Sequence, residues 1–590
     1  MEWDLTTIYP SLGDVSFLED IEKLKQLVSQ WNYLVPKLTH NANVCEQLKN
    51  ALHLELELMM LASKLGGYVS LISSVDTDNS RASKFEDLID QIVNQTVEQM
   101  TNFEEFVSQI DIDQLILEDD FLNEHAFILK EIKQSSTHRL SSKEESIIAM
   151  MRQTGSTSFA RLKDQIIGNM LVDFQVGETV QKMPLTMILN KAYVKDPTIR
   201  KQAYLAEIAA YKQTQDGLAA CLNAIKGEAI TIASLRGYTS VLDQTLFESR
   251  MDKQTLDVML EAIKESLPKF RHYMKVKARY LGYENGLPFY ELYAPVVDDV
   301  KEYSYEEAGD FVCQQFATFD QEMADMARCA IDNRWIDIYP RKEKVGGAFC
   351  ASVPSLKESR ILLNFGGTFD SVVTMAHELG HAYHNLCGKN ESLLNLNSPM
   401  PLAETASTFN ETIVKKAAIK TLPKKEALAV LETEISGCNQ VIVDIYSRFL
   451  FEDSLIKARQ DGPLSANEIC ALMEQAQIES YGDGLDKNYR HPYMWTWKPH
   501  YYYATSNYYN FPYAFGQLFA KGLYAIYLQK GDVFVPEYKK LLASTGKMSI
   551  YDVAKRAGID VHDLNFWRNS IQMICDDIDT FEQLLNDECF

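Results

Sequence analysis

Two histidines four residues apart, His377 and His381, enclose a glutamate in the segment TMAHELGH. An α-helix turns about 100° per residue, so side chains at i and i+4 lie on one face, about one turn apart. Both imidazoles can therefore point at one metal ion, and zinc accepts imidazole nitrogens at about 2.0–2.1 Å. Glu378, beside the first histidine, could take a proton from a metal-bound water. The alternative is an ordinary helix whose histidines lie on a solvated face.

A third ligand is needed, because a catalytic zinc usually has three protein ligands and an open position for water. The next candidates lie in SPMPLAETASTFNETIV, where Pro399 and Pro401 mark a helix start. Glu404 and Glu411 are seven residues apart and so share a helix face. One carboxylate could bind the ion, and the other could accept the free ring N–H of a ligand histidine. The alternative for Glu411 is a solvated helix charge.

The helix that carries the two histidines has its own signals. Asp370 or Ser371 can cap its first turn. Gly380 costs about 1 kcal/mol inside a helix, which predicts close packing against another segment. His384 lies seven residues after His377 on the same face. It could support the metal site or be a packed core histidine.

Helices must supply most of the framework around these residues. Apolar residues recur at three- and four-residue spacing in the segments 19–38, 84–107 and 255–281. Two short segments just before the HELGH helix differ, EKVGGAFCASVP (343–354) and SRILLNFGG (359–367), which are rich in β-formers and bounded by glycine. They predict a small sheet, with helix connectors as the alternative.

A chain of 590 residues exceeds one simple core and predicts two or more lobes. The segment VKDPTIR (194–200) contains Asp196 and Pro197, which together indicate a helix start. We therefore expect an N-terminal helical lobe at residues 1–195 and a catalytic domain at residues 196–590.

Composition narrows the function classes. A net charge of −24 argues against nucleic acid and against an anionic membrane surface as partners. The ten cysteines are scattered without a Cys-x-x-Cys pair, which favours free thiols in a reducing compartment. The N-terminal residues MEWDLTTIYPSLGD lack the apolar core of a signal peptide, and no uncharged apolar run is long enough to span a bilayer. These features predict a cytoplasmic protein, with a secreted protein that has no leader sequence as the alternative.

The motif TMAHELGHAYH followed by LAETASTFNE resembles the zinc peptidases of the oligoendopeptidase F and thimet oligopeptidase family, and most of all its oligoendopeptidase F branch. The resemblance covers nearly the whole chain, including WDLTTIYPSL near the start, ASLRGYTSVLDQTLFESRMD at 233–252 and NYYNFPYAFGQLF near the end. It implies a mainly α fold: a two-lobed helical ellipsoid with a deep central cleft and a small β-sheet beside the HExxH helix.

The resemblance also implies a set of site residues. It implies one Zn²⁺ per chain held by His377, His381 and Glu404, with Glu378 as the catalytic base and Glu411 as the supporting acid. The stretch GGAFC, which begins with Gly346, Gly347 and Ala348, matches the edge that pairs with the substrate backbone. An unpaired strand edge offers hydrogen bonds to any peptide sequence. The implied substrates are short, unstructured peptides.

A second cluster, WTWKPHYYYATSNYYNFPYAFG, also resembles the family. In the family, a histidine and later tyrosines of this segment contact the substrate carbonyl or its neighbours. His500 and Tyr509 are the best matches, and Tyr513 is a weaker one. For most tyrosines of this stretch, aromatic packing is the alternative. The chain reads ATSN where family members often have glycine, which affects how freely the loop moves and which tyrosine reaches the substrate.

The function expected from these residues is zinc-dependent cleavage of internal bonds in oligopeptides. One alternative is a zinc carboxypeptidase or dipeptidyl carboxypeptidase, which would need a positive group for the substrate's terminal carboxylate. The other is a helical protein that binds peptides or stores zinc without catalysis. Glu378 argues against the latter, since a storage site needs no base beside its ligands.

Overall fold

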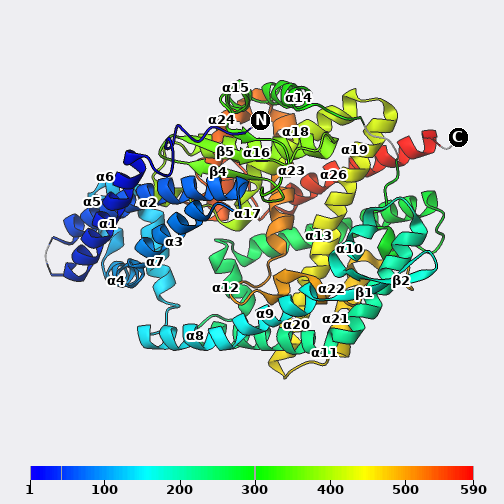
Figure 1. Ribbon diagram of the computed structural model, residues 1–590, viewed down its shortest axis with the longest axis horizontal. Coiled ribbons are helices and arrows are strands. Elements are labelled where there is room, and N and C mark those ends of the chain that lie inside the picture. Colours follow the sequence, from blue (N-terminus) through cyan, green and yellow to red (C-terminus); the bar gives the residue numbers. More distant parts are fainter. Residues whose placement is uncertain (1, 42, 298–300, 589–590) are drawn as a thin grey trace. The chain divides into compact units, whose positions relative to one another are not determined.

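The computed structural model describes residues 2–41, 43–297 and 301–588, and most of them are helical (Figure 1). The chain divides into two compact units. The first comprises residues 1–138, 301–417 and 526–559, and the second comprises residues 139–300, 418–525 and 560–590. Within the described residues, two small sheets interrupt the helices, so the predicted mainly α fold class is confirmed.

The predicted boundary at residues 195 and 196 lies inside the second unit. The helix start predicted there is confirmed, because the Asp196 side chain accepts a hydrogen bond from the backbone N–H of Thr198 and Pro197 opens the helix. The division into an N-terminal lobe and a catalytic domain at that point stays a prediction, since the two compact units are each built from three separate segments.

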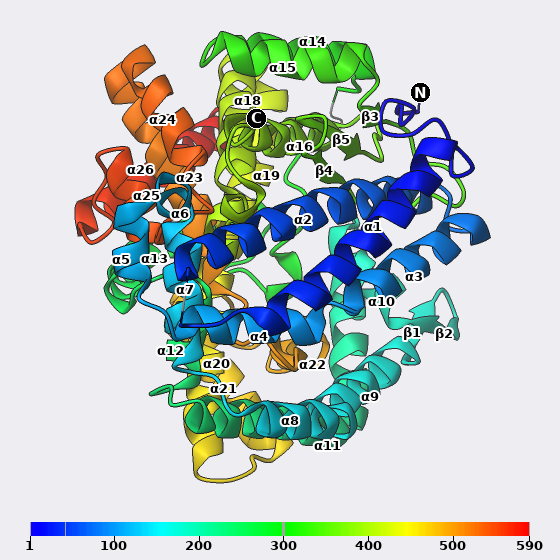
Figure 2. The ribbon, with the colours of Figure 1, turned by 90° about the vertical axis from the view of Figure 1, so that its left-hand side faces the viewer.

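The first unit begins with amphipathic helices. In α1 (Val15–Leu34) the buried residues Phe17, Ile21, Leu24 and Val28 recur at three- and four-residue spacing, which places them on one face. Figure 2 shows α1 beside α2, and these two helices and α3 contact one another. The other helices of this segment are α2 (Val44–Val75), α3 (Ser80–Asn94), α4 (Val97–Ser108), α5 (Ile112–Glu118), α6 (Asp120–Glu124) and α7 (Ala126–Ser136).

A three-stranded sheet lies in the same unit, with strand order β3-β5-β4. Strand β4 (Phe349–Val353) is antiparallel to β5 (Glu358–Leu362), and β3 (Ile336–Asp337) is parallel to β5. The two predicted strands and their place beside the HELGH helix are confirmed, since that helix packs on both β4 and β5. The strand expected to begin at Gly346 starts only at Phe349; residues 346–348 form the loop that leads into it.

The HELGH motif lies in α16 (Phe369–Cys387). Its cap is Thr368, whose side chain accepts from the N–H of Ser371, so the expected caps Asp370 and Ser371 are wrong by two to three residues. The threonine has extended backbone angles and an oxygen at the right place, which is what an N-cap requires. The remaining helices of this unit are α14 (Tyr305–Ala317), α15 (Gln321–Asp332), α17 (Met400–Ala403), α24 (Phe534–Leu542) and α25 (Ile550–Arg556), with α18 (Thr405–Thr421) leaving it at its end.

Gly380 is where α16 meets α18. A Cβ at this position would lie 2.6 Å from Cα of Ser407 and 2.8 Å from the carbonyl oxygen of Ala406. Real Cβ atoms do not approach backbone so closely, so only glycine allows this contact. The predicted close packing is confirmed.

The second unit is built around α11 (Pro197–Leu235), a helix of 39 residues. A hairpin of β1 (Leu171–Val176) and β2 (Thr179–Pro184) packs on it, and its turn uses Gly177 at φ +59°. This hairpin is not among the predicted elements. Its other helices are α8 (Ser142–Thr154), α9 (Ser156–Gly168), α10 (Leu185–Leu189), α12 (Val241–Glu248), α13 (Lys253–Tyr280), α19 (Lys424–Asn439), α20 (Ile445–Gln460), α21 (Ala466–Tyr481), α22 (Met494–Trp497) and α26 (Leu564–Glu588), and α23 (Phe511–Lys530) begins in it.

Two helices, α2 and α11, are long and apolar enough to cross a membrane by length and composition alone. Core helices of globular proteins pass the same test, and 39% and 56% of the two apolar windows are buried inside the protein. Nine cysteines of the described chain are free, as their spacing predicts, and Cys589 lies outside the described residues.

The contact at Gly380 generates a prediction about stability. Gly380→Ala should lower the free energy of unfolding by about 1–3 kcal/mol, because the added methyl group must push apart two backbones. Chemical denaturation followed by circular dichroism measures this change.

Gly66→Ala is the matched control, since Gly66 lies inside α2 and a Cβ there would meet nothing within 4 Å. This control should be about 0.5–1 kcal/mol more stable than the natural chain. Equal stability of Gly380→Ala and the natural chain would contradict the close approach of α16 and α18.

Candidate active site

Three side chains of the first unit converge on one point. The Nε2 atoms of His377 and His381 lie 3.2 Å apart, and Oε2 of Glu404 lies 3.1 Å from the first and 3.3 Å from the second. The histidines come from successive turns of α16, and Glu404 occupies the junction between α17 and α18. The hydroxyl of Ser407 donates a 2.7 Å hydrogen bond to Oε2 of Glu404 and so orients this carboxylate.

The spacing of these atoms fits a tetrahedral zinc ion. Ligand atoms at about 2.0–2.2 Å from such an ion lie roughly 3.3–3.6 Å from one another. The observed separations of 3.1–3.3 Å are close to this range. Among the histidine, cysteine and acidic side chains of the described part of the chain, these three lie close enough together to hold a metal ion. Two imidazoles and one carboxylate are also a donor set that zinc accepts.

Glu411 lies behind the first histidine. Its Oε1 accepts a 2.6 Å hydrogen bond from Nδ1 of His377, and its Oε2 accepts a 2.6 Å hydrogen bond from Nζ of Lys415. A proton on Nδ1 leaves the lone pair of His377 on Nε2, which faces Glu404 and His381. Burial disfavours the charged imidazole, but the hydrogen bonds with Glu404 and Glu411 outweigh it and raise the pKa of His377 to about 10. A metal ion would therefore compete with a proton for Nε2.

Glu378 is a buried carboxylate, 5% exposed, on the same helix. Its Oε2 has no hydrogen-bond partner among the residues that the structure describes. Burial raises the pKa of Glu378, and the neighbouring His377 and His381 counteract this shift. A carboxyl group with a raised pKa and a free oxygen is suited to accept and return a proton.

His384 points elsewhere. Its Nε2 lies 2.8 Å from the hydroxyl of Thr545 and 3.2 Å from the carbonyl oxygen of Leu542 in α24. Burial lowers its pKa to about 4, with a smaller contribution from the charge of His381. These contacts favour the packed-core alternative for His384 over a role in orienting a ligand.

The loop of Gly346, Gly347 and Ala348 precedes the edge strand β4. The side-chain amide of Asn364 donates to the carbonyl oxygens of Val345 (3.0 Å) and Gly347 (2.8 Å), and this holds the loop beside the strand. Gly347 has a φ of +80°, which favours glycine. In the sheet formed by the described residues, β4 is an edge strand that pairs with β5. The unpaired edge of such a strand can accept an added strand.

The aromatic cluster belongs to the second unit. The rings of His500 and Tyr509 stack with centroids 5.2 Å apart, and Tyr513 lies 5.7 Å from Tyr509. Burial, together with the positive charges of Arg448 and Lys498, lowers the pKa of His500 to about 4, so its ring is neutral near pH 7. The structure thus brings together the three residues that the resemblance selected in this stretch.

The loop before Tyr509 is anchored. Lys226 and Glu452 form a buried ion pair of 2.7 Å, and Lys226 also donates to the side-chain oxygen of Asn507 at 2.9 Å. Glu452 accepts from the backbone N–H of Tyr508 at 3.0 Å and from the side chain of Asn510 at 2.8 Å. Tyr508 is 2% exposed, and its hydroxyl donates to Asp453. It is therefore a packing residue, and the ATSN loop is held by side chains on both sides.

Sequence reasoning missed several supporting residues. Lys415 stands four residues after Glu411 on the same helix face, so the i,i+4 rule could have found it. Lys226 and Glu452 are 226 residues apart, and no sequence signal connects them. The metal-ligand candidates lie in the first unit and the aromatic cluster lies in the second.

Known protein families and relatives match this chain along most of its length. A sequence model of peptidase family M3 matches residues 191–573, and one described as oligopeptidase F matches residues 107–171. Oligopeptidase PepF of Bacillus subtilis (strain 168) is 25% identical over 593 residues, which cover 99% of this chain and 87% of that protein. An oligoendopeptidase F homolog of Lactococcus lactis subsp. lactis (strain IL1403) is 24% identical over 594 residues, covering 99% and 97%.

The fold is shared with solved structures as well. A crystal structure of a Chlamydophila abortus protein matches with a TM-score of 0.84 at 20% identity and covers 99% of this chain and 98% of that chain. The family match spans more than half of the 590 residues and includes both the HELGH helix and the aromatic cluster. The chain therefore belongs to peptidase family M3, in its oligopeptidase F branch.

Proposed function

We propose that this protein is a zinc-dependent endopeptidase that hydrolyses internal bonds of short oligopeptides. The observation that carries the proposal is the convergence of His377, His381 and Glu404 to within 3.1–3.3 Å, with the unpartnered carboxylate of Glu378 on the same helix. Membership in the peptidase family supports the reaction class.

In this proposal, His377, His381 and Glu404 hold the ion through two Nε2 atoms and one carboxylate oxygen. A zinc ion bound there supplies a Lewis acid that polarises a carbonyl group and lowers the pKa of water. Glu378 accepts the proton of the attacking water and delivers it to the nitrogen of the leaving amine. Glu411 keeps the proton of His377 on Nδ1, and Lys415 keeps Glu411 ionised through their 2.6 Å contact.

The substrate backbone is proposed to add to the free edge of β4 and its loop, where Gly346, Gly347 and Ala348 carry no bulky side chain. Hydrogen bonds to the substrate main chain do not depend on the substrate side chains, which suits an enzyme that accepts many peptides. Tyr509 and His500 are proposed to donate hydrogen bonds to the carbonyl oxygen as it becomes negative, with Tyr513 as a neighbouring contact. Folded proteins cannot offer such an extended strand.

The position of the cut separates the two enzymatic alternatives. An endopeptidase cleaves internal bonds and tolerates an amidated C-terminus, whereas a carboxypeptidase or dipeptidyl carboxypeptidase needs the free carboxylate. Mass spectrometry of matched peptides with free and amidated C-termini distinguishes them. Loss of cleavage only in the amidated set would replace the proposal by the second alternative. Absence of any cleavage by the zinc-loaded chain would favour a binding protein.

The partners and location remain those expected from the sequence. Short peptides are the proposed substrates, and the net charge of −24 supports the expectation that nucleic acid and anionic membranes are not partners. A cytoplasmic location stays a prediction.

The role of Glu378 generates the first prediction of this proposal. Glu378→Gln keeps the shape of the side chain but removes its capacity to accept a proton. Its kcat on a cleaved peptide should fall about 10²-fold or more, while zinc content stays at that of the natural chain. Asp370→Asn, an exposed change in the first turn of α16, is the control and should keep full activity. Near-normal turnover of Glu378→Gln would refute the assignment.

The assignment of Glu404 as the third ligand can be tested by measuring the zinc content of a variant. Glu404→Ala should lose zinc on dialysis as well as activity, since two histidines leave the tetrahedral site half open. Metal analysis by mass spectrometry of the dialysed protein measures the occupancy. The control is Glu57→Ala on the exposed face of α2, which should retain zinc. One tightly held zinc per chain in Glu404→Ala would mean that another residue is the ligand.

The tyrosines give the last prediction of this group. Tyr509→Phe should lower kcat by about 10²–10³, since one donor to the developing oxyanion contributes about 2.7–4 kcal/mol. KM and thermal stability should change little. Tyr508→Phe should show the opposite pattern, with activity kept and about 1–3 kcal/mol of stability lost, because its buried hydroxyl has a protein partner.

Tyr513→Phe completes this series, since Tyr513 is 37% exposed beside Tyr509. If only Tyr513→Phe loses kcat, the role belongs to Tyr513. If all three variants remain active, the cluster is structural.

A further inference from the structure

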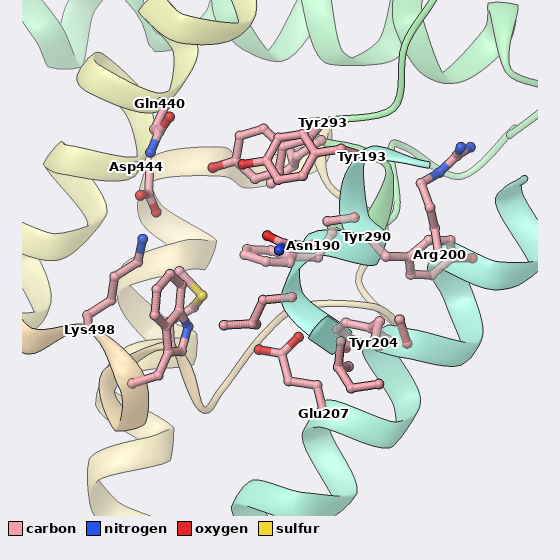
Figure 3. Close-up of a pocket in the computed structure, with 18 of the residues that line it drawn as sticks. Asn190, Tyr193, Arg200, Tyr204, Glu207, Tyr290, Tyr293, Gln440, Asp444 and Lys498 are labelled. Atoms are coloured by element: carbon pink, nitrogen blue, oxygen red, sulfur yellow. The ribbon is translucent and has the colours of Figure 1, made fainter. Parts of the chain in front are cut away.

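We propose that a separate pocket in the second unit binds a small zwitterion, namely a free amino acid with an apolar or aromatic side chain. The pocket has a volume of about 360 Å³ and lies among α10, η2 (Asn190–Tyr193), α11, η3 (Phe289–Glu291), the π-helical turn η5 (Gln440–Asp444) and α22 (Figure 3). Pockets of roughly 300–1,000 Å³ are typical of small-molecule sites. The inference does not rest on the proposed zinc chemistry.

Among the described residues, the pocket has one cation, Lys498, with which no carboxylate pairs. Its Nζ makes no hydrogen bond or ion pair in this part of the chain and lies 4.1 Å from the centre of the Trp497 ring. Burial and the charge of Arg448 lower the pKa of Lys498 to about 8, and Asp444 and Glu207 act in the opposite direction. Lys498 is half-buried, so its ammonium group is partly desolvated and gains from an anionic partner. A ligand carboxylate would supply the missing partner.

The other charges of the pocket are distributed differently. Arg200 is paired with Glu291 at 2.5 Å. Asp444 forms an ion pair with Arg448 and accepts a hydrogen bond from the hydroxyl of Tyr481 at 3.1 Å. Arg200 and Asp444 therefore already have charged partners within the protein and need no charged group of a ligand.

Glu207 is the complementary anion. One of its oxygens lies 3.1 Å from Nε2 of His491, and no lysine or arginine pairs with it among the described residues. Figure 3 shows the Glu207 carboxylate and the Lys498 side chain rising from different walls of the cavity. An α-ammonium group could reach Glu207 while the α-carboxylate meets Lys498, so one small zwitterion would satisfy both charges.

Aromatic rings line the remaining walls. Tyr193 and Tyr293 stand 5.2 Å apart between ring centroids, and Tyr204 and Tyr290 stand 5.5 Å apart. Tyr193 is 62% exposed, so the cavity reaches the protein surface beside it. Such walls offer contact area to an apolar or aromatic side chain.

The π-helical turn is an independent sign of function. Its first and last residues, Gln440 and Asp444, both line the cavity. A π-helical turn adds a residue to a helical turn and weakens its hydrogen bonding, and such turns occur frequently at functional sites. Here it turns two polar side chains toward the pocket.

The test is calorimetric titration of the full-length chain with L-phenylalanine and L-leucine. At least one should bind at millimolar concentration, and the analogues N-acetyl-L-phenylalanine and L-phenylalaninamide, which each lack one charge, should bind about tenfold more weakly or worse. Lys498→Met and Glu207→Gln should weaken binding of the free amino acid to a similar degree. Lys212→Met, an exposed lysine of α11 outside the pocket, should bind as the natural chain does.

Two further variants separate binding in this pocket from misfolding and from binding at the proposed metal site. Tyr193→Ala alters an exposed rim residue, so it should fold normally and still bind more weakly. Glu404→Ala should bind normally, which separates the pocket from the proposed metal site. Binding that survives in Lys498→Met and Tyr193→Ala, binding lost in Glu404→Ala, or no binding of either amino acid would each overturn the proposal.

Discussion

The close approach of α16 and α18 is the constraint on which the proposed metal centre depends. At Gly380 the two backbones come so near that a methyl group would overlap Ser407. The hydroxyl of Ser407 donates a hydrogen bond to Glu404, which lies at the junction of α17 and α18 and faces the two histidines. One glycine therefore decides the distance between helices, and that distance decides whether a carboxylate can share a point in space with two imidazoles.

The negative charge around the place where His377, His381 and Glu404 meet would attract a cation. Three carboxylates surround the two histidines, and Lys415 offsets only part of their charge. In the absence of metal, Glu404 and Glu411 raise the pKa of His377 to about 10, so a proton occupies the nitrogen that a metal would use. The arrangement that raises this pKa is the one that would attract zinc, because both effects come from uncompensated negative charge near Nε2.

Two lysines of the second unit, one buried and one half-buried, differ in their partners. Lys226 is paired with Glu452, and the pair is used to hold the loop of Asn507 and Tyr508. Lys498 lines a cavity with aromatic walls, and no carboxylate pairs with it in the part of the chain that the structure describes. Structural charges are normally paired where they are buried. The contrast within one unit is the reason for assigning Lys498 to a ligand.

The sequence by itself determined the helical class, the two strands before the motif and the set of candidate ligands. Helical periodicity and the i,i+4 spacing of His377 and His381 are local properties that can be read along the chain. The helix start at Pro197 and the close packing at Gly380 were also predicted from residues that are near one another in the sequence. The hairpin at residues 171–184 was missed, although its alternation around Gly177 is also local.

Only the tertiary structure decided which distant groups meet. It separated Tyr508, a packed residue bonded to Asp453, from Tyr509, which stacks on His500. It turned His384 toward Thr545 and placed Glu411 behind His377. It also placed Lys498 in its pocket beside the Trp497 ring, where no carboxylate of the described residues pairs with it. These outcomes depend on contacts between segments far apart in sequence, and on how burial changes the free energy of a charge, which neither residue type nor spacing encodes.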